Sequence, residues 1–80
     1  MTNLHGPYRI VDRAILIEKA NRGNDPRRRF YRAMLSNNRY ETYLAEVGSV
    51  SVQVHSYRSG PITGRMEILY ARRSGWIEDA

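Results

Sequence analysis

The clearest apolar pattern in the chain is typical of an amphipathic helix. Its apolar side chains recur at i, i+1, i+4 and i+5 and so line one stripe of a helix: Phe30, Tyr31, Met34 and Leu35. Asp25 is a favoured helix cap, and Pro26 is a favoured first helical residue. The pattern predicts a helix over residues 26–36.

A second helical pattern follows directly. Apolar side chains recur at i, i+3, i+4 and i+7: Tyr40, Tyr43, Leu44 and Val47. Asn38 with Glu41 three residues later resembles a capping box, and Gly48 is a helix stop. We predict a helix over residues 39–47, joined to the preceding helix by a tight turn.

Residues 12–21 fit either of two structures. Asp12 can cap a helix that ends near Ala20, and the Ala, Leu, Glu and Lys of this segment favour a helix. A short apolar run separates helix from strand poorly, and three isoleucines also suit a pair of strands: Ile10, Ile15 and Ile17. We favour the helix.

The segment "SVSVQVHSY", residues 49–57, alternates valines with polar residues. The valines are Val50, Val52 and Val54. This alternation is typical of a strand with one buried face. Gly and Pro in residues 58–64 then predict a turn or loop.

Residues 63–74 are best explained as a helix. Thr63 is its cap and Gly75 its stop, and apolar side chains share one face: Ile62, Met66, Leu69 and Tyr70. This placement puts Ile68 on the outer side of the helix.

The same segment can also be interpreted as a strand. Residues 65–71 would then form a β-hairpin with residues 49–57, and three helices followed by a hairpin is the order of a winged helix. The presence of both helix caps favours the helix. The strand at 49–57 then has no obvious partner except residues 8–11.

The chain has 80 residues, enough for one domain. The predicted elements make it a helix-rich α+β domain over residues 1–80, in which residues 1–7 form a loose lead-in. Cysteine is absent, which excludes disulfides and thiolate metal sites. There is no signal-peptide pattern and no apolar run of about 20 residues, so we expect a cytoplasmic protein without a membrane partner.

Charge is distributed unevenly along the chain, whose formal net charge is +5. Residues 1–40 contain nine Lys/Arg and three Asp/Glu, which is +6, whereas residues 41–80 contain four and five, which is −1. Twelve of the thirteen basic residues are arginine, whose planar guanidinium suits bidentate contacts to phosphate or carboxylate.

Arginines gather around the helix predicted over residues 26–36. A helical projection places Arg29 and Arg32 opposite the apolar stripe, with Arg28 on the flank and Arg27 at the apolar rim. Each cation in a first helical turn costs about 0.3–1 kcal/mol against the helix dipole, which favours a face for an anionic partner over the alternative of an ordinary solvated basic face. The predicted nucleic-acid or anion-binding patch contains Arg22, Arg27, Arg28, Arg29, Arg32 and Arg39.

A weaker candidate anion site lies at the predicted start of the last helix. If Thr63 opens that helix, its hydroxyl, free N–H groups and Arg65 converge on one point that can hold a phosphate or carboxylate. Arg72 follows seven residues after Arg65 and shares its helix face. The alternative is an ordinary cap beside surface arginines.

The sequence contains no catalytic signature, and we expect no enzyme, no cofactor and no metal site. His5 and His55 are far apart and have no carboxylate or cysteine at ligand spacing. Glu41 and Glu46 point about 140° away from each other on one short helix, so they do not converge as an acid–base pair. Neither a glycine-rich phosphate loop nor a nucleophile elbow is present.

These features predict a small basic protein that binds nucleic acid, DNA rather than RNA, mainly through phosphate contacts. The two central helices are similar to a helix-turn-helix motif, but the second would present Glu41 and Glu46 to the DNA. We therefore expect contacts from the arginine-rich first helix, with weak selectivity for base sequence.

The alternative is a small interaction protein, an adaptor or inhibitor of the kind encoded by mobile elements. It would dock its basic face on an acidic surface of a larger protein. A homodimer is also compatible with the sequence, through the unpaired strand at 49–57 or through an exposed Ile68.

Overall fold

The computed structural model of the chain describes residues 4–54 and 60–80. Its helices are α1 (Arg13–Ala20), α2 (Arg28–Ser36), α3 (Tyr40–Val47) and α4 (Gly64–Arg73). Its strands are β1 (Tyr8–Ile10), β2 (Ser51–Val52), β3 (Ile62–Thr63) and β4 (Ile77–Asp79). Helices with two small antiparallel sheets confirm the predicted α+β domain.

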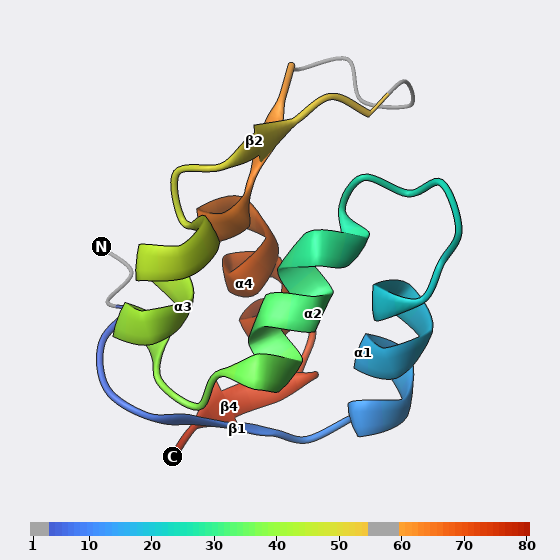
Figure 1. The fold of residues 1–80 in the computed structure, drawn as a ribbon. Coiled ribbons are helices and arrows are strands. Elements are labelled where there is room, and N and C mark those ends of the chain that lie inside the picture. The colour runs from blue at the N-terminus through green and yellow to red at the C-terminus, as the bar shows by residue number, and fades with distance from the viewer. Residues whose placement is uncertain (1–3, 55–59) are drawn as a thin grey trace.

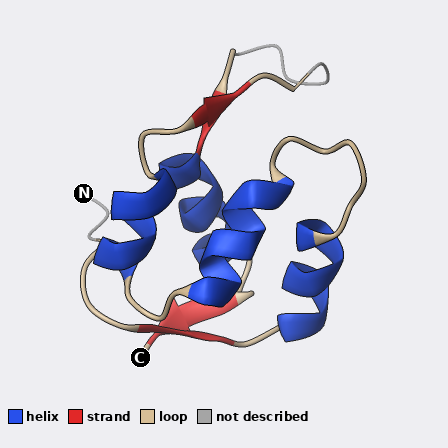
Figure 2. Ribbon diagram, in the orientation of Figure 1, coloured by secondary structure: helices blue, strands red, loops and turns tan. Residues whose placement is uncertain are grey.

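The two sheets lie at opposite ends of the helices (Figure 1). β1 pairs antiparallel with β4, which places Tyr8 opposite Asp79 and joins segments far apart in the sequence. β2 pairs antiparallel with β3, with Ser51 opposite Thr63. Both sheets are two-stranded and short, so helix packing dominates the fold (Figure 2). None of the described helices is long and apolar enough to cross a membrane.

The core lies between the helices, with α2 at its centre. In Figure 1, α2 lies between α1 and α3, and it contacts α4 as well. Burying one large apolar side chain contributes about 1.5–3 kcal/mol. The largest fully buried side chains are Tyr40, Tyr43, Phe30, Leu16, Met34, Ile62, Ile68 and Ile77.

The caps predicted for α1 and α4 are confirmed. Asp12 Oδ1 accepts a hydrogen bond from the N–H of Ile15 at 3.2 Å, and Thr63 Oγ1 accepts one from the N–H of Met66 at 3.2 Å. After α4, Gly75 adopts φ +82°, a left-handed conformation that side chains disfavour. Local side-chain chemistry therefore sets the ends of these two helices.

Two other predicted helix starts differ from the structure. α2 begins at Arg28 rather than residue 26, because Asp25 caps a turn that precedes the helix and accepts the N–H of Arg27 at 2.9 Å. The predicted capping box is absent from α3, because Glu41 Oε1 accepts the N–H of Gly6 at 3.0 Å. A donor far away in sequence thus replaces the local one.

The strand predicted over residues 49–57 is reduced to Ser51–Val52, and residues 55–57 lie outside the described part of the chain. Its partner is β3, whereas residues 8–11, the candidate partner, pair with β4 through β1. The β-hairpin alternative is wrong because residues 65–71 are helical within α4. The winged-helix order is therefore not present.

Of the loose lead-in predicted over residues 1–7, the structure describes residues 4–7, and these belong to the fold. Leu4 is buried in the core. Pro7 forms a β-bridge with Arg39. The start of the described chain is therefore held against α3.

The inward face of α4 differs from the predicted one. Its buried residues are Gly64, Glu67, Ile68 and Ala71. Ile68 is fully buried, whereas Met66 and Tyr70 of the predicted apolar face are exposed; of that face only Ile62 and Leu69 contact the core. The homodimer contact predicted through an exposed Ile68 is therefore wrong.

Candidate functional site

The outer face of α2 carries a cluster of cations that no described carboxylate neutralises. Phe30 and Met34 are fully buried, which turns Arg29 and Arg32 towards solvent and leaves Arg28 half-buried on the flank. The helical projection predicts the same placement. Among the described residues, none of these three arginines forms an ion pair with a carboxylate. We call them the α2 arginine face.

Arg32 is held in place by the end of α1. Its Nε donates a hydrogen bond to the carbonyl oxygen of Ala20 at 2.9 Å. Ala20 is the last residue of α1, and the last carbonyls of a helix have no partner within it. The bond therefore satisfies a helix end and fixes the guanidinium beside α1.

Four other arginines predicted to bind an anion are instead paired with carboxylates. The pairs are Arg22 with Glu18, Arg27 with Asp25, Arg39 with Glu41, and Arg72 with Asp79. Apart from the largely buried pair of Arg27 with Asp25, these are surface pairs, which contribute at most about 1 kcal/mol to stability. Each carboxylate offsets part of the charge that a phosphate would otherwise meet. Of the six arginines predicted to form the patch, the three of the α2 arginine face are those without a described carboxylate partner.

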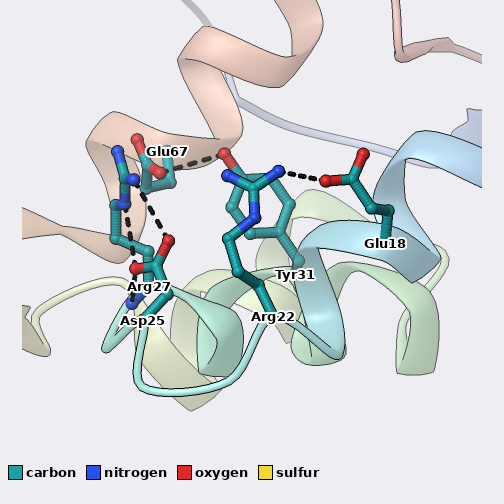
Figure 3. A network of polar contacts seen from close by, with 6 residues as sticks. All are labelled: Glu18, Arg22, Asp25, Arg27, Tyr31 and Glu67. Carbon is teal, nitrogen blue, oxygen red and sulfur yellow. Dashed lines mark hydrogen bonds and ion pairs between the residues drawn. The ribbon is translucent and has the colours of Figure 1, made fainter.

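Arg27 belongs to a polar network between α2 and α4 (Figure 3). Its Nε and Nη2 donate to Asp25 Oδ1 and Oδ2, both at 3.1 Å, and the two side chains are only 23% and 15% exposed. Hydrogen bonding from Arg27 lowers the pKa of Asp25 below its ordinary value. The guanidinium of Arg27 is therefore held by Asp25 within the folded structure.

Glu67 is the buried carboxyl of the network and was not among the predicted site residues. It is 5% exposed, and the hydroxyl of Tyr31 donates to its Oε1 at 2.9 Å. Burial raises the pKa of Glu67, while the Tyr31 hydrogen bond and the charges of Arg27 and Lys19 offset part of that rise. The signal in the sequence is spacing: Glu67 follows Gly64 by three residues, on the face that packs inward.

Lys19 closes the network from the side of α1. Its Nζ lies 5.5 Å from the ring centre of Tyr31 and 5.1 Å from that of Trp76. A cation over an aromatic ring contributes about 0.5–1 kcal/mol at an exposed site. The network therefore joins α1, α2 and α4, and we expect it to contribute to stability.

Stability is expected to depend on pH through Glu67. Its folded-state pKa lies above the ordinary 4.5, so the folded state holds this proton more tightly than the unfolded state does. The contribution of Glu67 is therefore complete below pH 4.5 and is lost as pH rises through the higher folded pKa. In urea unfolding from about pH 4 to 8, the wild type should lose stability with rising pH relative to Glu67→Gln. A difference that does not change with pH would contradict this assignment.

The start of α4 does not supply the open anion site predicted at Thr63 and Arg65. Thr63 Oγ1 accepts the N–H of Met66. The N–H of Gly64 donates to the carbonyl of Val50 at 3.1 Å, and the N–H of Arg65 donates to the carbonyl of Gly48 at 3.3 Å. Three of the four first-turn donors are therefore occupied, and Arg72 is held apart by its ion pair.

α3 carries two carboxylates, Glu41 and Glu46, outside its buried face. Its inward residues are Tyr40, Tyr43 and Val47. The N–H groups of Glu41 itself and of Gly6 lower the pKa of the Glu41 carboxyl, which stays charged. Glu46 Oε1 accepts a hydrogen bond from Asn37 Nδ2 at 3.1 Å. Two carboxylates on this helix disfavour an approach to phosphates.

Within residues 4–54 and 60–80, no group of three or more His, Cys, Asp or Glu is close enough to hold a metal ion. His5 Nδ1 lies 3.2 Å from Glu41 Oε2, while His55 lies outside the described residues.

No protein family model, curated protein or solved structure matches the chain. A function must therefore be argued from surface chemistry.

Proposed function

We propose that the α2 arginine face binds the phosphate backbone of nucleic acid, with duplex DNA as the preferred partner of a small cytoplasmic protein. The observation that carries the proposal is that no described carboxylate pairs with Arg28, Arg29 or Arg32. Three such cations within two turns of one helix create a local positive potential that attracts polyanions.

The spacing and chemistry of the face support phosphate contacts. Arg28 and Arg32 are four residues apart, so they are neighbours on the helix surface, with about 5–6 Å between their Cβ atoms. Arginine donates to phosphate through a planar fork, which lysine lacks. Because the neighbouring helix α3 carries Glu41 and Glu46, the contacts position the protein on DNA without reading its sequence.

DNA affinity is expected to fall steeply with salt. Each phosphate contact contributes about −0.9 to the slope of log K against log salt concentration for duplex DNA. Arg28→Ala and Arg29→Ala should therefore each reduce the magnitude of the slope by about one. Fluorescence anisotropy of a labelled duplex, titrated across a salt series, measures the slope.

Arg39→Ala is the matched control for this measurement. It removes the same charge, but from an arginine that pairs with Glu41 outside the α2 arginine face, so the slope should stay close to that of the wild type. Arg32→Ala is unsuitable because it also frees the carbonyl of Ala20. Equal changes in Arg39→Ala and Arg29→Ala, or a wild-type slope near zero, would refute the proposal.

A second candidate function is docking on an acidic protein, and the outer side of α4 favours it. Met66 and Tyr70 are 45% and 46% exposed, and Tyr70 packs edge-to-face against Trp76 with ring centres 5.3 Å apart. Lys19 of α1 lies over the ring of Trp76, and Arg73 is exposed on α4. Met, aromatic and Arg side chains are enriched at protein interfaces. A failed DNA titration, with nuclease-resistant capture of one stoichiometric protein, would favour this function.

A further inference from the structure

A pocket of about 560 Å³ opens between β1, the start of α1 and the end of α2. Small-molecule sites typically measure about 300–1,000 Å³. Among the described residues no carboxylate lines this pocket, and its charged side chains are Arg13 and Arg9, of which Arg9 pairs with Glu78 behind it. The lining residues that matter here are Arg9, Ile10, Arg13, Leu35, Ser36 and Asn38.

Arg13 supplies a charge that no described carboxylate neutralises. It is the first residue of α1 and is exposed, and its neighbour Asp12 instead caps α1 by accepting the N–H of Ile15. Arg9 supplies a second guanidinium, held by Glu78 on β4, with its Nε donating to Oε2 at 2.8 Å and its Nη2 lying 2.6 Å from the same oxygen. Both bonds reach one carboxylate oxygen, which orients Arg9 and leaves its Nη1 without a described partner.

The end of α2 would repel an anion if its carbonyls were bare, because a helix C-terminus carries partial negative charge. Side-chain hydrogen bonds cover two of its last four carbonyls and one carbonyl of the preceding turn. The bonds run from Ser36 Oγ to Arg32 O at 2.9 Å, from Asn37 Nδ2 to Ala33 O at 2.8 Å, and from Tyr8 OH to Met34 O at 2.6 Å. These bonds reduce the negative potential at the end of α2, and Arg13 and the Glu78-paired Arg9 supply the positive charge at the pocket.

The remaining wall of the pocket is apolar. Ile10 and Leu35 are half-buried and pack against the core, so each offers its outer surface to the pocket. Asn38 is exposed at the rim, and its side-chain amide makes no hydrogen bond to the described residues. A flat ring can cover the apolar wall while an anionic group attached to it reaches the arginines.

We propose that this pocket binds a phosphate monoester attached to a flat apolar body. The phosphate lies between Arg13 and Arg9, because guanidinium forks match phosphate oxygens in geometry and charge. The body covers Ile10 and Leu35. The same chemistry is present in a free nucleoside monophosphate and in the phosphorylated end of an oligonucleotide. The pocket lies at the end of α2 opposite to Arg28, so it is distinct from the proposed DNA contacts.

Adenosine monophosphate, adenosine and inorganic phosphate test the pocket as separate probes. In amide chemical-shift titrations, adenosine monophosphate should give saturable shifts at residues 9–13 and 35–38, and each of the other two should bind more weakly. Arg13→Ala should weaken its binding by about tenfold or more, through the loss of charge-assisted hydrogen bonds. Arg29→Ala, which changes the net charge equally, should leave it unchanged. Thermal unfolding of Arg13→Ala close to that of the wild type checks that the variant is folded.

Two thymidine oligonucleotides, with a 5′-phosphate or a 5′-hydroxyl, separate the two ligand sources. Displacement of adenosine monophosphate by the phosphorylated oligonucleotide alone supports a terminal phosphate, and the absence of that preference supports a free mononucleotide. The proposal is overturned if the wild type shows neither saturable amide shifts with adenosine monophosphate nor a preference for the 5′-phosphate. It is also overturned if Arg13→Ala and Arg29→Ala lose equal affinity for adenosine monophosphate. Mononucleotide binding without duplex binding would refute only the proposed function.

Discussion

Gly64→Ala is expected to lower the free energy of unfolding by about 3 kcal/mol, because it overpacks the contact between α3 and α4. Gly64 is buried at the start of α4. A methyl group there would overlap the carbonyl oxygen of Val47 and lie 2.8 Å from its carbonyl carbon. Both are backbone atoms, so only a displacement of α4 relieves the clash. That displacement would also break the 2.6 Å hydrogen bond from Tyr43 OH to the Gly64 carbonyl.

Urea unfolding at neutral pH measures this effect, and Gly23→Ala is its matched control. A methyl group at Gly23 meets no atom within 4 Å, so we expect the free energy of unfolding to change by less than about 1 kcal/mol. Similar losses at the two glycines would show that the close approach of α4 to Val47 is not what requires Gly64.

Tyr31→Phe is expected to cost about 2 kcal/mol, because it leaves the buried Glu67 carboxyl without its side-chain donor. The hydroxyl donates to Glu67 Oε1 at 2.9 Å, and Glu67 has almost no exposed surface through which water could replace it. Hydrogen bonds to charged groups contribute about 1.5–3 kcal/mol, more than those between neutral groups. The loss is measured by urea unfolding above the folded pKa of Glu67.

Two further variants give this prediction its control. Tyr8→Phe removes a buried hydroxyl that donates to the neutral carbonyl of Met34, and should cost only about 1 kcal/mol. Combining Tyr31→Phe with Glu67→Met removes both polar partners, so it should restore part of the stability lost in Tyr31→Phe alone. If the double variant is less stable than Tyr31→Phe, the loss in Tyr31→Phe does not come from a Glu67 carboxyl left without a hydrogen-bond donor.

The helices near the centre of the chain could be predicted because their information is local. Phe30 and Met34 repeat at helical spacing, and their burial directs Arg29 and Arg32 outward whatever the rest of the fold does. The same holds for the caps Asp12 and Thr63, whose partners are three residues away. The α2 arginine face was predictable for this reason.

The orientation of α4 could not be predicted from hydrophobicity. Its apolar positions include Met66 and Tyr70, which are exposed, while its inward face contains a glycine and a glutamate. Gly64 faces inward because a small residue lets α4 approach Val47 closely. Glu67 faces inward because the hydroxyl of Tyr31 donates a hydrogen bond to its carboxyl group. Neither reason is visible without the neighbouring helices.

The sequence by itself determined the helix-rich character of the domain, most helix boundaries and the outward direction of Arg29 and Arg32, because periodicity and capping act within a few residues. Only the tertiary structure decided the pairing of β1 with β4, the inward face of α4 and the hydrogen bond from Tyr8 to the Met34 carbonyl at the end of α2. It also decided the ion pair of Arg72 with Asp79 and the hydrogen bond of Arg32 to the carbonyl of Ala20, which form only once separate elements pack. Contacts between elements depend on close approach in space, which local sequence patterns do not encode.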